Sequence, residues 1–435
     1  MADEEMARNR ARPRPGRRFR LRRSIAACLV GSVVLRCAES ATGTMLGFYL
    51  AHIAATQYQV SATVVAVIVG SAFLTELGGA PFFGALSDRW GRKRFILLGP
   101  LLGAVAVQMT AMTSILGLLL VTRLLEGLST ASTTPPTLSY LSAITTRSQT
   151  LRGRVMAAYE VASTGGMALG AVVAGFLWDG LGAAGFVVLT VLYLVSLGVF
   201  GWGIQDVRMP GVKPKATTSS DSHWRRYVVA LTRPRVLHFV PVWLAVNAIV
   251  GIWFTHTAFQ MAGDSAFPDQ LLVGGFSGSA VGLFFGAFIV VFAVGALLWG
   301  NAFGRLRKTS IMLVALGGMM LLGVGGLVAN HSGGWPALAA VPVYVLLLVA
   351  ILLVSGFPPA ALGYLADISE ADPATRGTVM GLYSVLLGMG HLLGGWLGGP
   401  FADWAGMDGL LVLSLGLAVL AVGAVWLLRR DDRPE

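Results

Sequence analysis

The feature that most constrains this chain is a series of long apolar runs, each of about 18 or more residues, separated by short polar segments. A run of that length is what an α-helix needs to cross the hydrocarbon core of a bilayer. Inside lipid a helix satisfies its own backbone hydrogen bonds, so these runs predict a bundle of membrane-spanning helices. Charged residues make up only 12% of the chain, about half of their usual share in soluble domains, which excludes an ordinary soluble fold.

Twelve such runs are present, and a polar segment over 206–236 divides them into two sets of six. We therefore expect an all-α membrane protein with twelve transmembrane helices in two six-helix, pseudo-symmetric halves. Its expected parts are a basic N-terminal tail (1–24), a first bundle (25–205), a linker (206–236), a second bundle (237–428) and a short tail (429–435). The expected spans lie near 25–51, 60–83, 95–112, 115–138, 155–178, 183–204, 237–261, 277–301, 310–329, 338–362, 378–401 and 409–428.

The basic residues predict the orientation of the chain. Of the 32 Lys and Arg residues, all but Arg36 and Arg123 fall in the tails, the linker and the loops of one predicted side. Basic loops stay in the cytoplasm, so both termini are expected to be cytoplasmic, in a cell inner membrane. The net charge of +11 therefore reflects topology rather than nucleic-acid binding, and the basic tail is expected to lie against anionic lipid headgroups. Cys28 and Cys37 both lie in the first run, which is too long for a removable signal peptide, and they do not form a disulfide framework.

The two sets of spans resemble each other in sequence. A shift of 224 residues brings 152–182 onto 376–406. The matching residues are Arg152, Gly153, Val155, Met156, Tyr159, Gly166, Gly170, Gly175, Asp179 and Gly182, which meet Arg376, Gly377, Val379, Met380, Tyr383, Gly390, Gly394, Gly399, Asp403 and Gly406. Gly-rich apolar sequence can match by chance, but the aligned Arg, Tyr and Asp residues favour a true repeat. Parallel repeats of this kind are typical of transporters.

Glycines recur near helical spacing in both copies of the repeat. Small residues let two helices approach closely in lipid, where apolar side chains have no other reason to associate. Gly166 and Gly170 in the fifth span, and Gly390 and Gly394 in the eleventh, are therefore candidates for a gating surface on which the halves rock. Static helix packing is the alternative.

A compact motif joins the second and third spans, with the sequence GALSDRWGRKR over 84–94. Gly84 permits close helix approach and Gly91 a tight reversal. Asp88 can accept hydrogen bonds from a helix N-terminus or from an arginine. We expect a gate that latches the two halves in one state, formed by Gly84, Asp88, Arg89, Gly91 and Arg92; for the basic residues, topology-setting charge is the alternative. The second half has a reduced copy of the motif, with Gly304 in place of the aspartate.

Two acid–base pairs are expected near the middle of the membrane: Arg36 and Glu39 in the first span, and Arg123 and Glu126 in the fourth. Both pairs have i, i+3 spacing, which places acid and base on one helix face. A charge at that depth costs a few kcal/mol, which makes each pair a candidate functional site. The alternative is a structural ion pair that fastens two helices together.

Other polar residues in the spans are weaker candidates. Glu76 in the second span is deep enough to bind a proton, whereas Glu160 lies near the end of the fifth span. Candidates for lining a substrate site are Asn247, Trp253 and His256 in the seventh span and Tyr344 in the tenth. Helix packing is the alternative for each of them.

These motifs resemble the major facilitator superfamily. Segment 84–94 is similar to the loop signature of that family, and Arg123 followed by Gly127 is similar to its fourth-span pattern. The glycines of the fifth span resemble the motif of the family's drug–proton antiporters, although Ala171 replaces its proline and Ala174 one of its glycines. The resemblance covers the whole chain and implies a secondary transporter that works by alternating access, with a cavity lined by the first, fourth, seventh and tenth spans.

We therefore expect a transporter and not an enzyme, because metalloprotease and nucleotide-binding motifs are absent from the sequence. A channel is disfavoured by the lack of repeated rings of charge.

The expected activity is proton-coupled efflux of a small amphipathic molecule, with Glu39, Glu126 and Glu76 in proton coupling and Arg36 and Arg123 in the substrate site. The alternative is proton-coupled uptake, or transport of an organic anion or lipid with Arg36 or Arg123 as the anion site. No cofactor or metal is expected; the expected partners are a small-molecule substrate, protons and membrane lipid, and the chain is expected to be a monomer.

Overall fold

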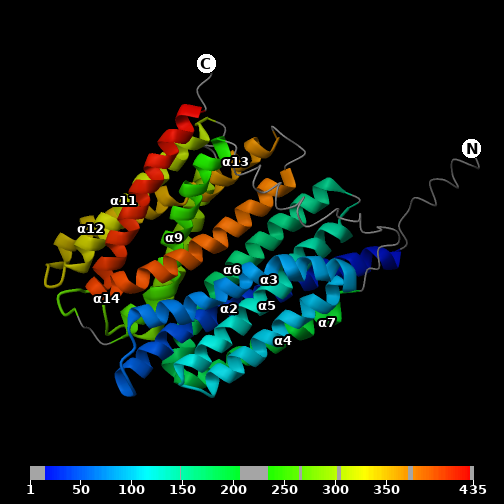
Figure 1. Ribbon diagram of the computed structural model, residues 1–435, viewed down its shortest axis with the longest axis horizontal. Coiled ribbons are helices and arrows are strands. Elements are labelled where there is room, and N and C mark those ends of the chain that lie inside the picture. Colours follow the sequence, from blue (N-terminus) through cyan, green and yellow to red (C-terminus); the bar gives the residue numbers. More distant parts are fainter. Residues whose placement is uncertain are drawn as a thin grey trace, which may run out of the picture.

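The computed structural model of the protein describes residues 15–146, 148–205, 234–263, 267–300, 305–370 and 376–431, and all regular secondary structure in these ranges is helical (Figure 1). The first part of the chain forms α2 (Pro15–Thr56), α3 (Ala62–Trp90), α4 (Arg92–Ala111), α5 (Leu116–Ile144), α6 (Gln149–Leu181), the 3-10 turn η1 (Gly182–Ala184) and α7 (Gly185–Gly203). The second part forms α9 (Pro234–Ala262), α10 (Gly278–Trp299), α11 (Lys308–Asn330), α12 (Ala337–Val354), α13 (Phe357–Glu370) and α14 (Arg376–Asp431). Much of the predicted tail and nearly all of the predicted linker lie outside the described residues.

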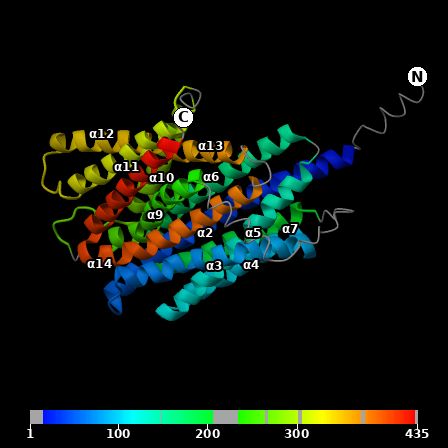
Figure 2. The same ribbon diagram turned by 45° about the horizontal axis from the view of Figure 1, so that its top comes forward.

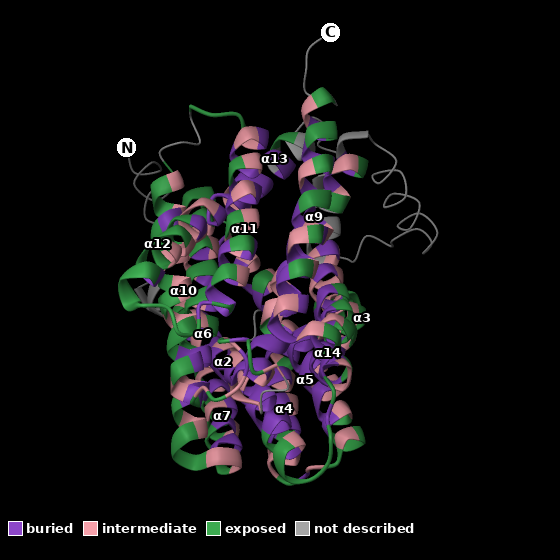
Figure 3. Cartoon of the chain, turned by 90° about the vertical axis from the view of Figure 1, so that its left-hand side faces the viewer, coloured by how far each residue is buried: buried purple, intermediate pink, exposed green. Residues whose placement is uncertain are grey.

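The helices are those of a membrane protein. Within the described ranges, nine helical stretches are long and apolar enough to cross a bilayer. The outer surface suits lipid, since side chains such as Leu297 and Leu338 are 79% and 87% exposed. Figure 3 shows this division, with buried residues inside the bundle and exposed ones around it. The predicted all-helical, multi-pass membrane fold is confirmed.

The run expected as one span over 338–362 is divided between α12 and α13. The break lies at Ser355 and Gly356, immediately before Phe357 and the two prolines that follow it. Proline has no amide hydrogen to donate and disfavours helical geometry in the residue before it, so a new helix begins here.

The last two expected spans, 378–401 and 409–428, both belong to α14. Ala405 and Gly406 are non-helical inside it, and Gly406 has a φ of 57°. That backbone conformation is accessible to glycine because it lacks a Cβ atom. The label α14 therefore covers two helical segments, one on each side of this kink, and the kink lies between the two expected spans (Figure 1).

Each described helix packs against particular neighbours. In the first part α2 packs against α6 and α7, and α5 against α3 and α4; in the second part α9 packs along α14, and α11 against α12. The two parts meet where α3 contacts α14, α6 contacts α10 and α2 contacts α9. Figures 1 and 2 both show the first portion of α14 beside α3.

We call the end of the bundle away from Pro15 and Asp431 the distal face; α6 ends there, α3 and α10 begin there, and α14 bends there (Figure 1). A buried apolar cluster near this end joins residues of both parts, among them Phe48 of α2 and Ile252 of α9. The remaining apolar core consists of one cluster inside each part. Among the described residues, buried apolar packing between the two parts is therefore found near the distal face.

Candidate functional site

α5 has one buried face that is rich in hydroxyl side chains. Ser129, Thr130, Ser132, Thr133 and Thr137 are all less than a tenth exposed. Several of their hydroxyl groups donate to backbone carbonyls three or four residues earlier, which satisfies them inside the helix. α5 is thus absent from the nine apolar stretches although it is 29 residues long. Its polar face is what surrounds the candidate charged residues.

The first predicted pair is formed within α2. Arg36 Nη1 lies 2.8 Å from Glu39 Oε2, and the two side chains are 18% and 11% exposed. Both reach α5: Arg36 Nη2 donates to the Thr134 hydroxyl at 2.8 Å, and Thr130 donates to Glu39 Oε1 at 3.0 Å. The pair therefore links α2 to α5 and keeps some access to the interior of the bundle.

The second predicted pair lies within α5 itself, where Arg123 Nη1 contacts Glu126 Oε2 and the side chains are 8% and 6% exposed. Arg123 Nη2 also donates to the Val69 carbonyl of α3 at 3.4 Å, and the Tyr193 hydroxyl of α7 donates to Glu126 Oε1 at 3.2 Å. Among the described residues, Arg123 Nε is buried without a hydrogen-bond partner.

Glu76 on α3 is the fifth member of this group, which we call the charged cluster: Arg36, Glu39, Glu76, Arg123 and Glu126. It is half-buried and interacts electrostatically with Arg36, Glu39 and Arg123. In the described part of the chain it makes no hydrogen bond or ion pair. The cluster thus contains three carboxyl groups and two guanidinium groups, and one bound proton would bring its formal charge to zero.

The structure adds three residues that sequence reasoning missed. Thr130 and Thr134 join the Arg36–Glu39 pair to α5, and Tyr193 joins Glu126 to α7. The run of hydroxyl residues over 129–134 inside an apolar span was a usable signal for the threonines. Tyr193 gave no signal beyond being a polar residue in an apolar span.

The candidates of the second part do not join this cluster. His256 is fully buried and its Nε2 lies 2.9 Å from the Gly395 carbonyl of α14, while Asn247 donates to the Trp243 carbonyl of its own helix at 2.8 Å. Trp253 is partly buried against the distal apolar cluster. Tyr344 is 53% exposed on α12. These positions favour helix packing for His256 and Asn247.

The loop motif over 84–94 lies at the end of α3 opposite the distal face, which we call the proximal end. Gly91 has a φ of 99° between α3 and α4, and its amide hydrogen donates to the Ser87 carbonyl at 3.0 Å. Arg92 Nη2 contacts Asp88 Oδ1 at 2.9 Å, and Ser139 of α5 donates to the same oxygen at 3.4 Å. Both partners of Asp88 belong to the first part of the chain. Arg89 is exposed, and Gly84 faces Pro135 of α5.

The four candidate gating glycines lie at close helix contacts inside each part. A Cβ atom on Gly166 would meet the Val33 carbonyl of α2 at 2.6 Å, and one on Gly170 would overlap the Cys37 carbonyl. Gly390 and Gly394 are held in the same manner against Asn247 and Ala248 of α9. Other glycines of the same helices meet the opposite part of the chain, among them Gly175, against α10, and Gly399, against α3.

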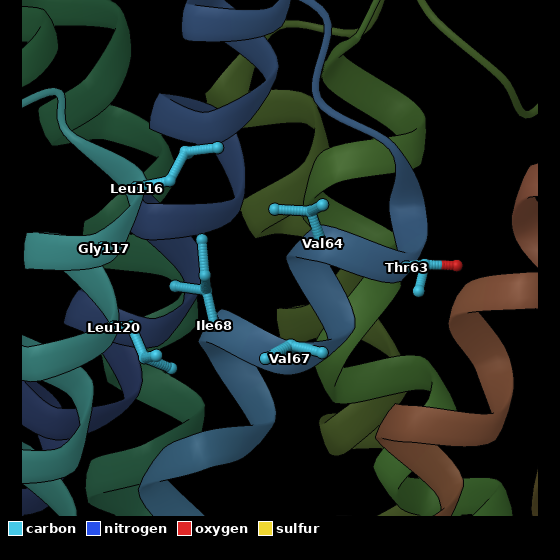
Figure 4. Close-up of a pocket in the computed structure, with 7 residues that line it drawn as sticks. All are labelled: Thr63, Val64, Val67, Ile68, Leu116, Gly117 and Leu120. Carbon is cyan, nitrogen blue, oxygen red and sulfur yellow. The ribbon is translucent and has the colours of Figure 1, made fainter.

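A small cavity of about 260 Å³ lies between the distal ends of α3 and α5 (Figure 4). It is lined by Thr63, Val64, Val67, Ile68, Leu116, Gly117 and Leu120. Because no ionisable side chain lines it, the chemistry of this cavity differs from that of the charged cluster, and we do not assign it to the site.

Known proteins show the same architecture. The family described as Major Facilitator Superfamily matches residues 28–343 and 265–435. A curated relative, "Multidrug resistance protein 2" of Bacillus subtilis (strain 168), is 22% identical over 387 residues, which covers 86% of this chain and 88% of the relative.

Solved structures of low sequence identity share the fold. The nucleoside transporter NupG has a TM-score of 0.71 at 14% identity, covering 94% of this chain and 99% of that structure. A bacterial homologue of the human lysosomal transporter Spinster, in an inward-facing and unoccupied conformation, has a TM-score of 0.63 at 13% identity, covering 96% of each chain. A mutant of the peptide transporter POT in complex with sulfate has a TM-score of 0.70 at 15% identity, covering 93% of this chain and 94% of that one.

Proposed function

The chain belongs to the major facilitator superfamily, whose members are transporters rather than enzymes, and we propose that it exports a small amphipathic molecule across the cell inner membrane in exchange for protons, by alternating access. In this proposal both termini are cytoplasmic, a monomer is the working unit, and the charged cluster carries the coupling proton.

Twelve spans in two sets of six fit the observed helices. α5 is long enough to cross the bilayer although it is too polar to be among the nine apolar stretches. Two of those nine, Gln149–Gly203 with 55 residues and Val385–Arg430 with 46, are each long enough to cross twice, since about 20 residues suffice. Gly182 and Gly406, with φ of 55° and 57°, lie where the chain would reverse. Adding α5 and these two extra crossings to the nine stretches gives twelve.

The observation that carries the proposal is the unequal charge of the cluster. Two guanidinium groups neutralise two of its three carboxyl groups, and Glu76 is left without a bonded partner among the described residues. An uncompensated charge inside a membrane protein is costly, so binding and release of one proton change the free energy of the cluster substantially. A rearrangement of the helices that alters the access of water to Glu39 or Glu76 would move that proton from one side to the other.

Export of an amphipathic molecule is supported by two weaker observations. The curated relative is named a multidrug resistance protein. The glycines of α6 also resemble the antiporter motif, with Ala171 and Ala174 as departures from it.

Anion transport through Arg36 or Arg123 is the rival hypothesis. Both guanidinium groups already contact a glutamate of their own helix, which leaves less attraction for a bound anion. The rival requires one of these pairs to separate when substrate arrives.

Purified protein in vesicles with an internal pH indicator tests the proposal, with lipophilic cations, organic anions and lysolipids supplied in turn. For at least one compound, the wild-type protein is expected to move protons in the direction opposite to the substrate. Glu39→Gln and Glu76→Gln are expected to reduce that flux roughly tenfold or more, because an amide cannot take up the coupling proton.

Glu160→Gln is the matched control, because Glu160 is an exposed glutamate of α6. It should leave the flux unchanged. Wild-type flux in both glutamine variants would contradict the coupling assignment, and saturable anion transport that Arg36→Gln abolishes and Glu39→Gln preserves would favour the rival.

A further inference from the structure

Two aspartates at equivalent positions of the repeat bind the starts of two helices in the opposite part of the chain. Asp179 of α6 accepts the amide hydrogens of Gly278 at 2.7 Å and Ser279 at 2.8 Å, which are the first two residues of α10. Each carboxylate oxygen receives one of them. The first amide hydrogens of a helix have no partner inside it and carry its positive partial charge, so a carboxylate is well placed there.

Asp403 of α14 makes the corresponding contact with α3. Its Oδ1 accepts the amide hydrogen of Ala62 at 2.6 Å, and its Oδ2 accepts those of the Thr63 amide at 3.0 Å and hydroxyl at 2.5 Å. Ala62 and Thr63 are the first two residues of α3. Figures 1 and 2 show the start of α3 beside the bend of α14 where Asp403 lies.

The residues around the two aspartate contacts are also arranged alike. Both target helices begin after a serine that caps the third amide: Ser61 accepts from Val64 at 3.3 Å, and Ser277 from Ala280 at 3.2 Å. Three residues after each aspartate, Gly182 and Gly406 end the helical run with nearly equal φ of 55° and 57°. The repeat therefore preserves the whole arrangement.

Close backbone contacts accompany both aspartates. A Cβ atom on Gly278 would lie 2.8 Å from the Gly175 carbonyl, and one on Gly399 would lie 2.7 Å from Thr63 Cα. The apolar cluster that joins both parts of the chain lies at the same end of the bundle. At the opposite end of the bundle, the partners that Asp88 has among the described residues, Arg92 and Ser139, lie in its own part.

We infer that Asp179 and Asp403 are a symmetric pair of latches that hold the distal side of the bundle closed in this structure, and that both must release when the charged cluster opens to that side. The inference rests on the proposed alternating-access function. Hydrogen bonds to a charged group contribute more than neutral ones, so the loss of one latch is expected to raise the distally open population about tenfold.

Spin-label distances across the distal face test the latches in the full-length protein. Cysteines replace Gly117 of the first part and Gly333 of the second. Both glycines are exposed, and a Cβ atom at either position would have no other atom within 4 Å. The native Cys28 and Cys37 are buried. The wild-type protein is expected to give mainly the short distance. Asp179→Asn and Asp403→Asn should each increase the long-distance population about tenfold, and the double variant more.

Asp408→Asn is the matched control, because Asp408 is a distal carboxylate whose partners, Asn330 and His331, lie in its own part. It should leave the distances unchanged. A folded double variant with the wild-type distribution, or an equal shift in Asp408→Asn, would overturn the inference.

If the double variant does not fold, Thr63→Val is measured instead. A smaller shift in the same direction supports the latch, and no shift overturns it. The distances need neither substrate nor protons, so a failure of the latches and a failure of the proposed coupling are separate results.

Discussion

Arg123 and Glu126 show how strongly single residues depend on one another in the interior of this protein. Each side chain is less than a tenth exposed, and each is the main charged partner of the other. Removing one member of such a pair leaves a buried charge without compensation, which costs about 3–5 kcal/mol, whereas replacing both by apolar residues is often nearly neutral.

Arg123→Leu is therefore expected to lower the free energy of unfolding by about 3–5 kcal/mol, and Arg123→Leu with Glu126→Leu to recover most of that loss. Thermal unfolding of the purified protein in detergent measures both variants, with the exposed Arg89→Leu as control. A double variant as unstable as the single one would show that the pair stabilises the fold through more than mutual neutralisation.

His331 at the distal face connects stability to pH. Its Nε2 lies 2.7 Å from Asp408 Oδ2, and its Nδ1 lies 3.7 Å from Asp269 Oδ2. The hydrogen bond to Asp408, followed by the nearby charges, raises the pKa of His331 above its ordinary value of 6.5. A group whose pKa is higher in the folded state stabilises that state fully below its unfolded pKa.

The stabilisation by His331 is thus expected to be complete below about pH 6 and to disappear as the pH rises through the folded pKa. The difference in melting temperature between the wild-type protein and His331→Gln, measured from about pH 5 to 9, should be largest at the acidic end. A difference that is constant or grows with pH would mean that the histidine is neutral in the folded protein.

At the scale of the helices, two adjacent glycines of α6 allow the effect of close helix packing on stability to be distinguished from the effect of helix propensity. Gly166 is buried, and a Cβ atom there would meet the Val33 carbonyl of α2 at 2.6 Å. Gly165 is exposed, and a Cβ atom there would meet nothing within 4 Å. Alanine favours a helix over glycine by up to about 1 kcal/mol at either position.

Gly165→Ala is expected to leave the protein as stable as the wild type or slightly more stable, and Gly166→Ala to destabilise it by about 1–3 kcal/mol through the forced separation of α2 and α6. Melting temperatures of the two variants, measured side by side, test this. Equal values would indicate that α2 and α6 are packed less closely than the structure has them.

The positions of the helices could be predicted from the sequence better than their breaks. Apolar runs identified nearly every helix, because a lipid-exposed helix must be apolar over about 20 residues whatever its neighbours are. The break before Pro358 depends on local backbone geometry that run length does not report, whereas the non-helical residues Ala405 and Gly406 lie between the two expected spans of α14. The i, i+3 spacing correctly predicted two ion pairs, Arg36–Glu39 and Arg123–Glu126.

Which helix face points inward was much less predictable. α12 is apolar on all sides, so its sequence gives no preferred face, and the place of the exposed Tyr344 in a substrate lining stays a prediction. The contacts of Thr130 with Glu39 and of Tyr193 with Glu126 join residues 91 and 67 positions apart, and they depend on how three helices are rotated against one another. Spacing within one helix cannot report that rotation.

For the whole molecule, the uneven distribution of basic residues predicts the orientation in the membrane. All but two of the 32 Lys and Arg residues fall in the predicted tails, the linker or the predicted loops of one side, while the predicted loops of the opposite side contain none. Loops with many Lys and Arg residues remain in the cytoplasm. The distal face should therefore face the outside of the cell, so the Asp179 and Asp403 latches would close the external entrance.

Labelling of whole cells with a membrane-impermeant maleimide tests this orientation. Gly333→Cys, in the exposed distal turn between α11 and α12, is expected to react in intact cells. Arg89→Cys, exposed at the proximal end of α3, should react only after the membrane is permeabilised. The wild-type protein is the background control, because its Cys28 and Cys37 are 0% and 6% exposed. The reverse pattern would place the basic loops outside the cell, and the charged cluster would then be closed toward the cytoplasm instead.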